Sequence, residues 1–157
     1  MKKFFTVKNL CLSGIIAALY AGLTVLLQAL SFGPVQIRVA EAMTLLPILT
    51  PAAIPGLTIG CFVANLISSP YVMDWAVGTM ATLIAAALSW RLRKNVYLAA
   101  LMPVLSNGLM VGVMLYFVAG GSMIFNILTV AGGELVACFA LGLPLIRALE
   151  KSPKLFQ

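Results

Sequence analysis

The chain alternates between long apolar segments and short polar stretches. Leu10–Leu30 and Val96–Val118 carry no charged residue, and each exceeds the roughly 18 apolar residues that indicate a membrane-spanning helix. Asp74–Trp90 and Met123–Ile146 are also predominantly apolar. The pattern predicts four spanning helices over these ranges.

The apolar stretch Val39–Ser68 is ambiguous. At about 1.5 Å per residue it is too long for one ordinary span and short for two. Pro51 and Pro55 interrupt it, and a proline lacks the N–H that a continuing helix needs. We expect two short helices, at about Arg38–Leu49 and Ile54–Ser68. A segment that dips into the membrane and returns is the alternative.

Composition supports the membrane assignment. Hydrophobic residues make up 62% of the 157 residues and charged residues 9%, whereas a soluble domain carries about 25% charged residues. No low-complexity tract or soluble domain is evident, so residues 1–157 are predicted to form a single transmembrane domain.

Positive charge is grouped at the ends of apolar segments. Nine of the ten basic residues form three clusters: Lys2, Lys3 and Lys8; Arg91, Arg93 and Lys94; and Arg147, Lys151 and Lys154. Such clusters are typical of cytoplasmic loops, and they favour contact with membrane lipids rather than nucleic acid. If all three are cytoplasmic, an even number of crossings separates each pair. The prediction is an all-α membrane protein with six transmembrane helices and both termini in the cytoplasm.

Glu134 is the most informative polar residue, because it lies near the middle of the last predicted helix. An ionisable group there costs at least about 2.5–3.5 kcal/mol. Its helical face also carries three small residues, Ala131, Ala137 and Cys138. Their short side chains leave space in front of the carboxyl group of Glu134. We expect Glu134 to contact a ligand or ion; a structural role as partner of a buried polar group is the alternative.

Arg38 and Glu41 form a second candidate pair, three residues apart on one helical face. They can pair with each other, as a solvated ion pair at the membrane interface, or present a guanidinium and a carboxylate to a bound molecule. Gln36 adds an amide beside them. All three are predicted binding residues at the outer side.

Three further side chains are candidates for ligand binding. Asn65 and Asn107 carry amides that donate and accept at once, with hydrogen bonding between helices as the alternative. Trp75 can stack on a flat ligand or anchor the helix at the interface. Asp74 is predicted to cap its helix, since aspartate is favoured at that position.

The first predicted helix carries small residues at a spacing of four. The two rows are Ser13, Ala17 and Ala21, and beside it Gly14, Ala18 and Gly22. Small side chains allow another helix to approach closely. We expect Ser13, Ala17 and Ala21 to form a docking face for a separate membrane protein; packing inside the chain is the alternative.

Residue types that are missing exclude several functions. The chain has no histidine and no GxxxxGK[ST] phosphate loop, and its three cysteines are far apart. No cofactor or metal site is expected, nor a catalytic triad or an ATPase of the phosphate-loop type. The chain is predicted not to be an enzyme.

Four motifs follow one another along the chain: Gln36-Ile37-Arg38-Val39-Ala40-Glu41, Thr58-Ile59-Gly60-Cys61-Phe62-Val63-Ala64-Asn65, Asp74 with Gly78, and Gly133-Glu134. In this order they resemble the pattern of the QueT family, whose members are substrate-binding membrane subunits (S components) of energy-coupling factor transporters. The spacing of Ala17 and Ala21 is similar to the AxxxA surface of such subunits.

The resemblance implies a six-helix bundle in the bacterial plasma membrane that binds a queuosine precursor, a 7-deazaguanine base, from outside. It also implies an EcfT-like transmembrane coupling protein and two separate ATPase subunits as partners. An S component for another vitamin or small heterocycle, or a membrane scaffold without a transported ligand, are the alternatives.

Overall fold

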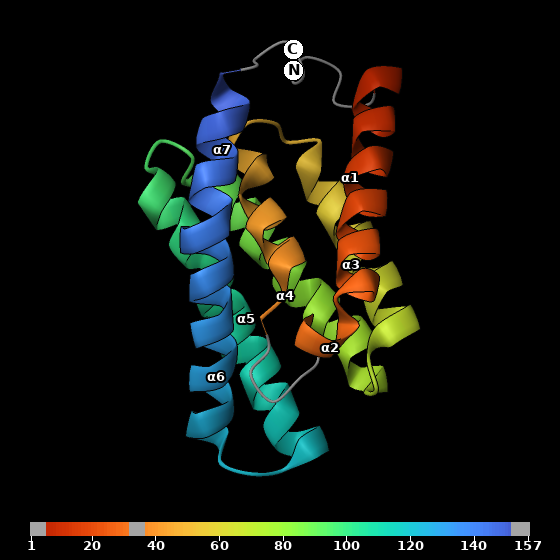
Figure 1. Ribbon diagram of the computed structural model, residues 1–157, viewed down its shortest axis with the longest axis vertical. Coiled ribbons are helices and arrows are strands. Elements are labelled where there is room, and N and C mark those ends of the chain that lie inside the picture. Colours follow the sequence, from red (N-terminus) through yellow and green to blue (C-terminus); the bar gives the residue numbers. More distant parts are fainter. Residues whose placement is uncertain (1–5, 32–36, 152–157) are drawn as a thin grey trace.

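The computed structural model describes residues 6–31 and 37–151, and within these ranges the chain forms helices and no strand (Figure 1). The elements are α1 (Val7–Leu26), α2 (Gln28–Ser31), η1 (Val39–Ile48), α3 (Ala53–Ser68), α4 (Val72–Arg91), α5 (Val96–Ala119), α6 (Met123–Leu135), η2 (Val136–Gly142) and α7 (Leu143–Glu150).

Four helices are long and apolar enough to cross a membrane. They are α1, α4, α5 and the continuous helix Met123–Glu150, which combines α6, η2 and α7. The helices η1 and α3 are apolar but shorter. Large hydrophobic side chains such as Ile15, Leu109 and Leu128 are more than half exposed, as expected for a surface that faces lipid. The prediction of an all-α membrane protein is confirmed.

The helices run alternately up and down the long axis of the molecule. Figure 1 shows the first turn of α1, the turn between α4 and α5, and the end of α7 at one end. The turns from α3 to α4 and from α5 to α6 lie at the opposite end. The helix pairs α1–α3, α3–α4, α4–α5 and α5–α6 pack side by side.

The short helix η1 lies in the middle of the bundle, in contact with α1, α3, α4, α5, η2 and α7. It is a 3₁₀ helix and not the α-helix that the sequence predicted. Pro47 lies inside it and has no N–H to donate. A 3₁₀ helix rises about 2.0 Å per residue, and an α-helix about 1.5 Å. The ten residues of η1 therefore span a greater length of the bundle than ten residues of an α-helix would.

The last span is also irregular, where the sequence predicted one continuous α-helix over Met123–Ile146. The segment η2 is a π-helix, and Pro144 follows it in the first turn of α7. A proline removes one backbone hydrogen bond and its ring crowds the preceding turn, which a wider π turn relieves. Gly142 lies so close to η1 that an added Cβ would be 2.8 Å from Leu45 Cδ1.

The first helix ends earlier than its predicted limit, Leu30. The α-helix stops at Leu26, and the short helix α2 follows after Leu27. The side-chain amide of Gln28 donates a hydrogen bond to the backbone carbonyl of Ser68 at 3.2 Å. This bond ties the end of α1 to the end of α3 and redirects the chain.

The described charged residues separate into two groups. Lys8, Arg91, Arg93, Lys94, Arg147, Glu150 and Lys151 lie on segments that meet at one end of the bundle. Arg38, Glu41, Asp74 and Glu134 are buried inside it. The turns at the opposite end, residues 69–71 and 120–122, carry no charge.

The contact between α1 and α3 depends on glycine. A Cβ added at Gly60 would lie 2.8 Å from the backbone oxygen of Ala17, and one at Gly56 would lie 2.7 Å from that of Ser13. These distances leave no room for a methyl group, so the two backbones touch.

Gly60→Ala should therefore lower the free energy of unfolding by about 1–3 kcal/mol, because it forces α1 away from α3. Gly132→Ala is the matched control, since an added Cβ there meets nothing within 4 Å. Denaturation of both purified variants in detergent micelles measures the difference. Equal stability of the two variants would show that α1 and α3 do not pack this closely.

Candidate functional site

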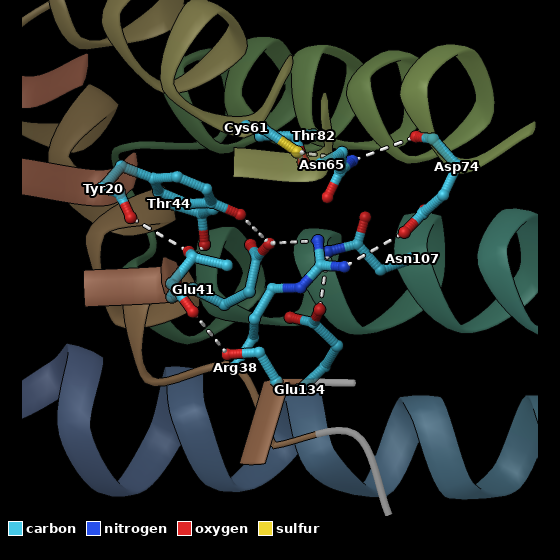
Figure 2. A network of polar contacts seen from close by, with 12 residues as sticks. Tyr20, Arg38, Glu41, Thr44, Cys61, Asn65, Asp74, Thr82, Asn107 and Glu134 are labelled. Carbon is cyan, nitrogen blue, oxygen red and sulfur yellow. Dashed lines mark hydrogen bonds and ion pairs between the residues drawn. The ribbon is translucent and has the colours of Figure 1, made fainter. Parts of the chain in front are cut away.

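The buried polar residues converge on Arg38, which directly precedes η1 and is 7% exposed. Its Nη2 is 3.4 Å from Asp74 Oδ2 on α4, and its Nη1 is 3.9 Å from Glu41 Oε1. Residues three apart eclipse each other in a 3₁₀ helix, which brings Glu41 over Arg38. Figure 2 shows the guanidinium between the two carboxylates.

Glu41 is fully buried in the first turn of η1. Its Oε1 accepts a short hydrogen bond from the hydroxyl of Tyr20 on α1, while its Oε2 has no hydrogen-bond partner. Its backbone carbonyl accepts a bond from Thr44 Oγ1 at 2.5 Å. Tyr20 thus connects the outer helix α1 to the centre of the cluster.

Glu134 lies in the last turn of α6, within the last span, and its side chain points to the same region. It is 6% exposed. Its Oε1 accepts a hydrogen bond of 2.7 Å from Asn107 Nδ2 on α5. Its Oε2 lies 3.9 Å from the thiol of Cys138 in the π segment. The same thiol is 3.7 Å from the backbone oxygen of Glu41, so the π segment joins the two acidic residues.

Asn65 and Asp74 form the side of the cluster between α3 and α4. Asn65 Nδ2 donates to the backbone oxygen of Asp74 at 2.9 Å and lies 3.5 Å from Cys61 Sγ. Gly78 is required beside them, because an added Cβ would be 2.8 Å from Asn65 Nδ2. Asn65 therefore holds the first turn of α4 in place next to Arg38.

Several buried oxygens of this cluster accept no hydrogen bond. They are Glu41 Oε2, Asn65 Oδ1, Asp74 Oδ1 and Asn107 Oδ1. Buried polar atoms are rarely left without a partner, since each costs about 1–3 kcal/mol. Within the described residues, these four acceptors therefore lie together without donors.

A small cavity opens between Arg38, Asn107, Val111, Val130 and Glu134. Its volume of about 10 Å³ is close to the space that one water molecule needs. The site therefore exists as a set of converging side chains, but it is closed to a molecule as large as a purine base in this conformation.

The sequence predicted most of this cluster. Arg38, Glu41, Asn65, Asn107 and Glu134 all belong to it. Arg38 and Glu41 pair with each other, one of the two alternatives that the sequence left open, although both are buried rather than solvated. Each asparagine makes a hydrogen bond to a neighbouring helix, the alternative that the sequence left open, and still has an unpaired oxygen.

Two other predicted binding residues are placed less closely. Trp75 is half-buried on α4, and its indole N–H is buried without a hydrogen-bond partner. Gln36 lies outside the described residues. The binding roles of both residues stay predictions.

The three residues of the predicted docking face lie along the α1–α3 contact. Ser13 is buried and its hydroxyl donates to the backbone oxygen of Ala52 at 2.7 Å, and Ala17 and Ala21 are half-buried. Ser13 and Ala17 also line an apolar groove of about 580 Å³ between α1 and α3. The row is thus partly packed inside the chain and partly open.

Sequence reasoning missed Tyr20 and misplaced Asp74. The prediction that Asp74 caps its helix is wrong: α4 begins at Val72, and the carboxylate of Asp74 points to Arg38 instead. Tyr20 is completely buried on a helix that mostly faces outward. Its position four residues before Thr24 and after Ile16, both buried, is the helical signal that marks the inner face of α1.

No group of three or more potential metal ligands lies together among the described residues. The cluster is a network of carboxylates, amides and one guanidinium.

Comparison with known proteins gives a family. The model of the QueT transporter family matches residues 10–151. A similar protein, "Queuosine precursor transporter QueT" from Lactococcus lactis subsp. cremoris (strain MG1363), is 40% identical over 76 residues. That match covers 47% of this chain and 44% of the relative, less than half of its length. No solved structure matches the chain. Since the family model covers nearly all of the described helices, the chain belongs to the QueT transporter family.

Proposed function

We propose that this chain is the substrate-binding membrane subunit of an energy-coupling factor importer and binds a queuosine precursor, a 7-deazaguanine base. The ligand class comes from the name of the relative. The observation that carries the proposal is the buried cluster around Arg38, whose oxygens lack donors in the middle of an otherwise apolar bundle. Polar groups at that depth mark substrate sites in membrane transporters.

The chemistry of the base fits these acceptors. The edge of a guanine-like ring presents adjacent N–H donors, which one carboxylate can accept together. Glu41 Oε2 has no hydrogen-bond partner and can accept one of these donors, while Oε1 already accepts from Tyr20. The amide of Asn107 has a second N–H beside the one that bonds Glu134, and this N–H can donate to the carbonyl of the base.

Binding requires the site to open, since the cavity of about 10 Å³ cannot hold a base. We place the entrance at the end of the bundle that carries no charged turn. Gln36 and Trp75 are proposed to line it, the latter at the start of α4. A lone water between Arg38 and Glu134 would leave as the base enters.

The proposed topology has six crossings, with both termini cytoplasmic and residues 1–157 as one domain. The alternating helix directions and the gathering of the described basic residues other than Arg38 at one end support it, because basic residues prefer the cytoplasmic side. The longer rise of the 3₁₀ helix η1 helps ten residues to reach through part of the membrane.

Energy would come from partners in the bacterial plasma membrane: an EcfT-like transmembrane coupling protein and two ATPases. The sequence has no phosphate loop of its own. We place the docking face on α1, where Ser13 and Ala17 line the groove next to α3 and Ala21 continues the row. A helix of the coupling protein could lie along these small residues.

Uptake of a radiolabelled 7-deazaguanine base tests this proposal. Cells without a transporter of their own would express the chain with or without a coupling protein and two ATPases. We expect accumulation only with the complete set, and none when the ATPases are inactivated. Ala17→Trp should abolish uptake and co-purification of the coupling protein but spare ligand binding. Accumulation without ATPases would contradict the energy-coupling mechanism.

A further inference from the structure

The helix α1 lies at the edge of the bundle. Among the four long helices it is the least buried: 17% of its most apolar stretch is inside the protein, against 28% to 50% in the other three. Its buried side chains, Ser13, Ile16, Tyr20 and Thr24, form a single stripe, and the stripe packs against α3 and η1. A helix held along one stripe shifts at a lower cost than a helix in the centre of the bundle.

Three side-chain hydrogen bonds join the segment of α1 and α2 to the rest of the bundle. Ser13 and Gln28, on either side of Tyr20 along the chain, donate to backbone carbonyls outside the cluster. The hydroxyl of Tyr20 donates to Glu41 Oε1, a carboxylate oxygen of the buried cluster. Of these three bonds, the Tyr20 bond is therefore the one through which the position of α1 acts on the cluster.

The turn of α1 that carries Tyr20 also touches α3 closely. A Cβ added at Gly60 would lie 3.0 Å from the Cβ of Tyr20 and 2.8 Å from the backbone oxygen of Ala17. Ala17, three residues before Tyr20, lines the apolar groove of about 580 Å³ between α1 and α3. A change that widens this contact, or a helix pressed into the groove, would move the hydroxyl away from Glu41.

Arg38 shares the oxygen of Glu41 that Tyr20 binds. The Arg38 Nη1 atom is 3.9 Å from Glu41 Oε1, and Figure 2 shows the hydroxyl and the guanidinium reaching this same oxygen. A separation of 3.9 Å exceeds the usual hydrogen-bond range of about 2.7–3.2 Å, so this ion pair has room to close. Without the hydroxyl, the carboxylate of Glu41 can turn toward Arg38 and take its open Oε2 out of position.

We propose that Tyr20 is a positioning residue that couples the packing of α1 to the ligand affinity of the buried cluster. When α1 is seated against α3 and η1, the hydroxyl holds Glu41 in the orientation that binds the base. When α1 is displaced, Glu41 is released and binding weakens. The inference rests on the proposed function for its ligand, and it assigns the route by which a protein docked on α1 would change the affinity of the site.

Tyr20→Phe tests the inference by removing the hydroxyl alone. Calorimetric titration of the purified full chain with 7-deazaguanine and with its 7-aminomethyl derivative measures the affinity. Couplings within proteins are typically about 5- to 150-fold, and one hydrogen bond supports the lower end, so we expect roughly 5- to 20-fold weaker binding. Tyr97→Phe is the matched control, because the Tyr97 hydroxyl accepts from Arg147 outside the cluster, and its affinity should be unchanged. Equal or tighter binding by folded Tyr20→Phe would overturn the inference.

Gly60→Ala tests whether the position of α1 acts through Tyr20. We expect this variant to bind more weakly than the unmodified chain, whereas Gly132→Ala, whose added Cβ meets nothing within 4 Å, should bind normally. In the double variant with Tyr20→Phe, the two losses of affinity should not multiply, because both remove the same bond. Losses that multiply in full would show that α1 acts by another route and would overturn the inference. If Gly60→Ala does not fold, the comparison of Tyr20→Phe with Tyr97→Phe decides it.

Failure of both bases to bind the unmodified chain would overturn the proposed function itself. Thermal unfolding of the same variants then decides whether the link exists. We expect Tyr20→Phe and Gly60→Ala to lower the unfolding temperature by less together than the sum of their separate effects. Fully additive effects would overturn the link between α1 and the cluster.

Discussion

Arg38→Met should lower the free energy of unfolding by about 3–5 kcal/mol, the cost of removing one partner from a buried ion pair. The substitution leaves Glu41 and Asp74 without the guanidinium that lies 3.9 and 3.4 Å from them. Titration of the purified protein with a denaturing detergent, followed by circular dichroism, measures the loss.

Two further variants make this result specific. Arg91→Met removes an exposed basic residue from the last turn of α4 and should change the stability by less than about 1 kcal/mol. Adding Asp74→Asn to Arg38→Met should recover part of the stability, because it removes one of the stranded carboxylates. If Arg38→Met costs no more than Arg91→Met, Arg38 does not hold the cluster together.

Glu134→Gln should weaken binding of a 7-deazaguanine base by roughly 10- to 100-fold and leave the fold intact. A charge-assisted hydrogen bond contributes about 1.5–3 kcal/mol, which corresponds to a change of that size in the dissociation constant. Glutamine retains an oxygen that can accept the bond from Asn107 Nδ2, now 2.7 Å from Glu134 Oε1. The contact between α5 and α6 is therefore preserved.

Isothermal titration of the variant, beside a thermal unfolding curve, separates binding from folding. Glu150→Gln serves as the control, because the carboxylate of Glu150 lies at the basic end of the bundle and outside the cluster. Unchanged affinity of folded Glu134→Gln would assign Glu134 a structural role, as the buried partner of Asn107.

The main features of the fold follow from the sequence because they depend on apolar segment length and on charge. Uninterrupted apolar runs predict the long helices to within a few residues. Pro51 lies between η1 and α3, and Pro55 lies in the first turn of α3. Glu134 and Arg38 stand out because a charged side chain in an apolar segment requires a partner.

The irregular helices could not be predicted in this way. Hydrophobic periodicity cannot distinguish the 3₁₀ helix η1 from an α-helix when eight of its ten residues are buried and no face is polar. The π turn before Pro144 depends on the close contact of Gly142 with Leu45, which joins residues almost a hundred positions apart.

Two members of the cluster, Tyr20 and Asp74, could not be predicted from the sequence either. In the sequence, Tyr20 cannot be distinguished from the other apolar residues of a spanning helix. Its hydroxyl reaches Glu41 only because α1 packs against η1 in the folded protein. Asp74 follows the rule for a helix cap, but α4 begins two residues earlier. Arg38, from a different part of the chain, then determines where its carboxylate points.

The structure of the protein with a 7-deazaguanine base bound is the most direct test that the buried cluster is the ligand site. We expect the cavity between Arg38, Asn107 and Glu134 to be enlarged and filled by the base. A carboxylate oxygen of Glu134 or Glu41 should lie at hydrogen-bonding distance, about 2.7–3.2 Å, from an N–H group of the base. A base bound elsewhere, such as in the apolar groove between α1 and α3, with the cluster unchanged, would contradict the account.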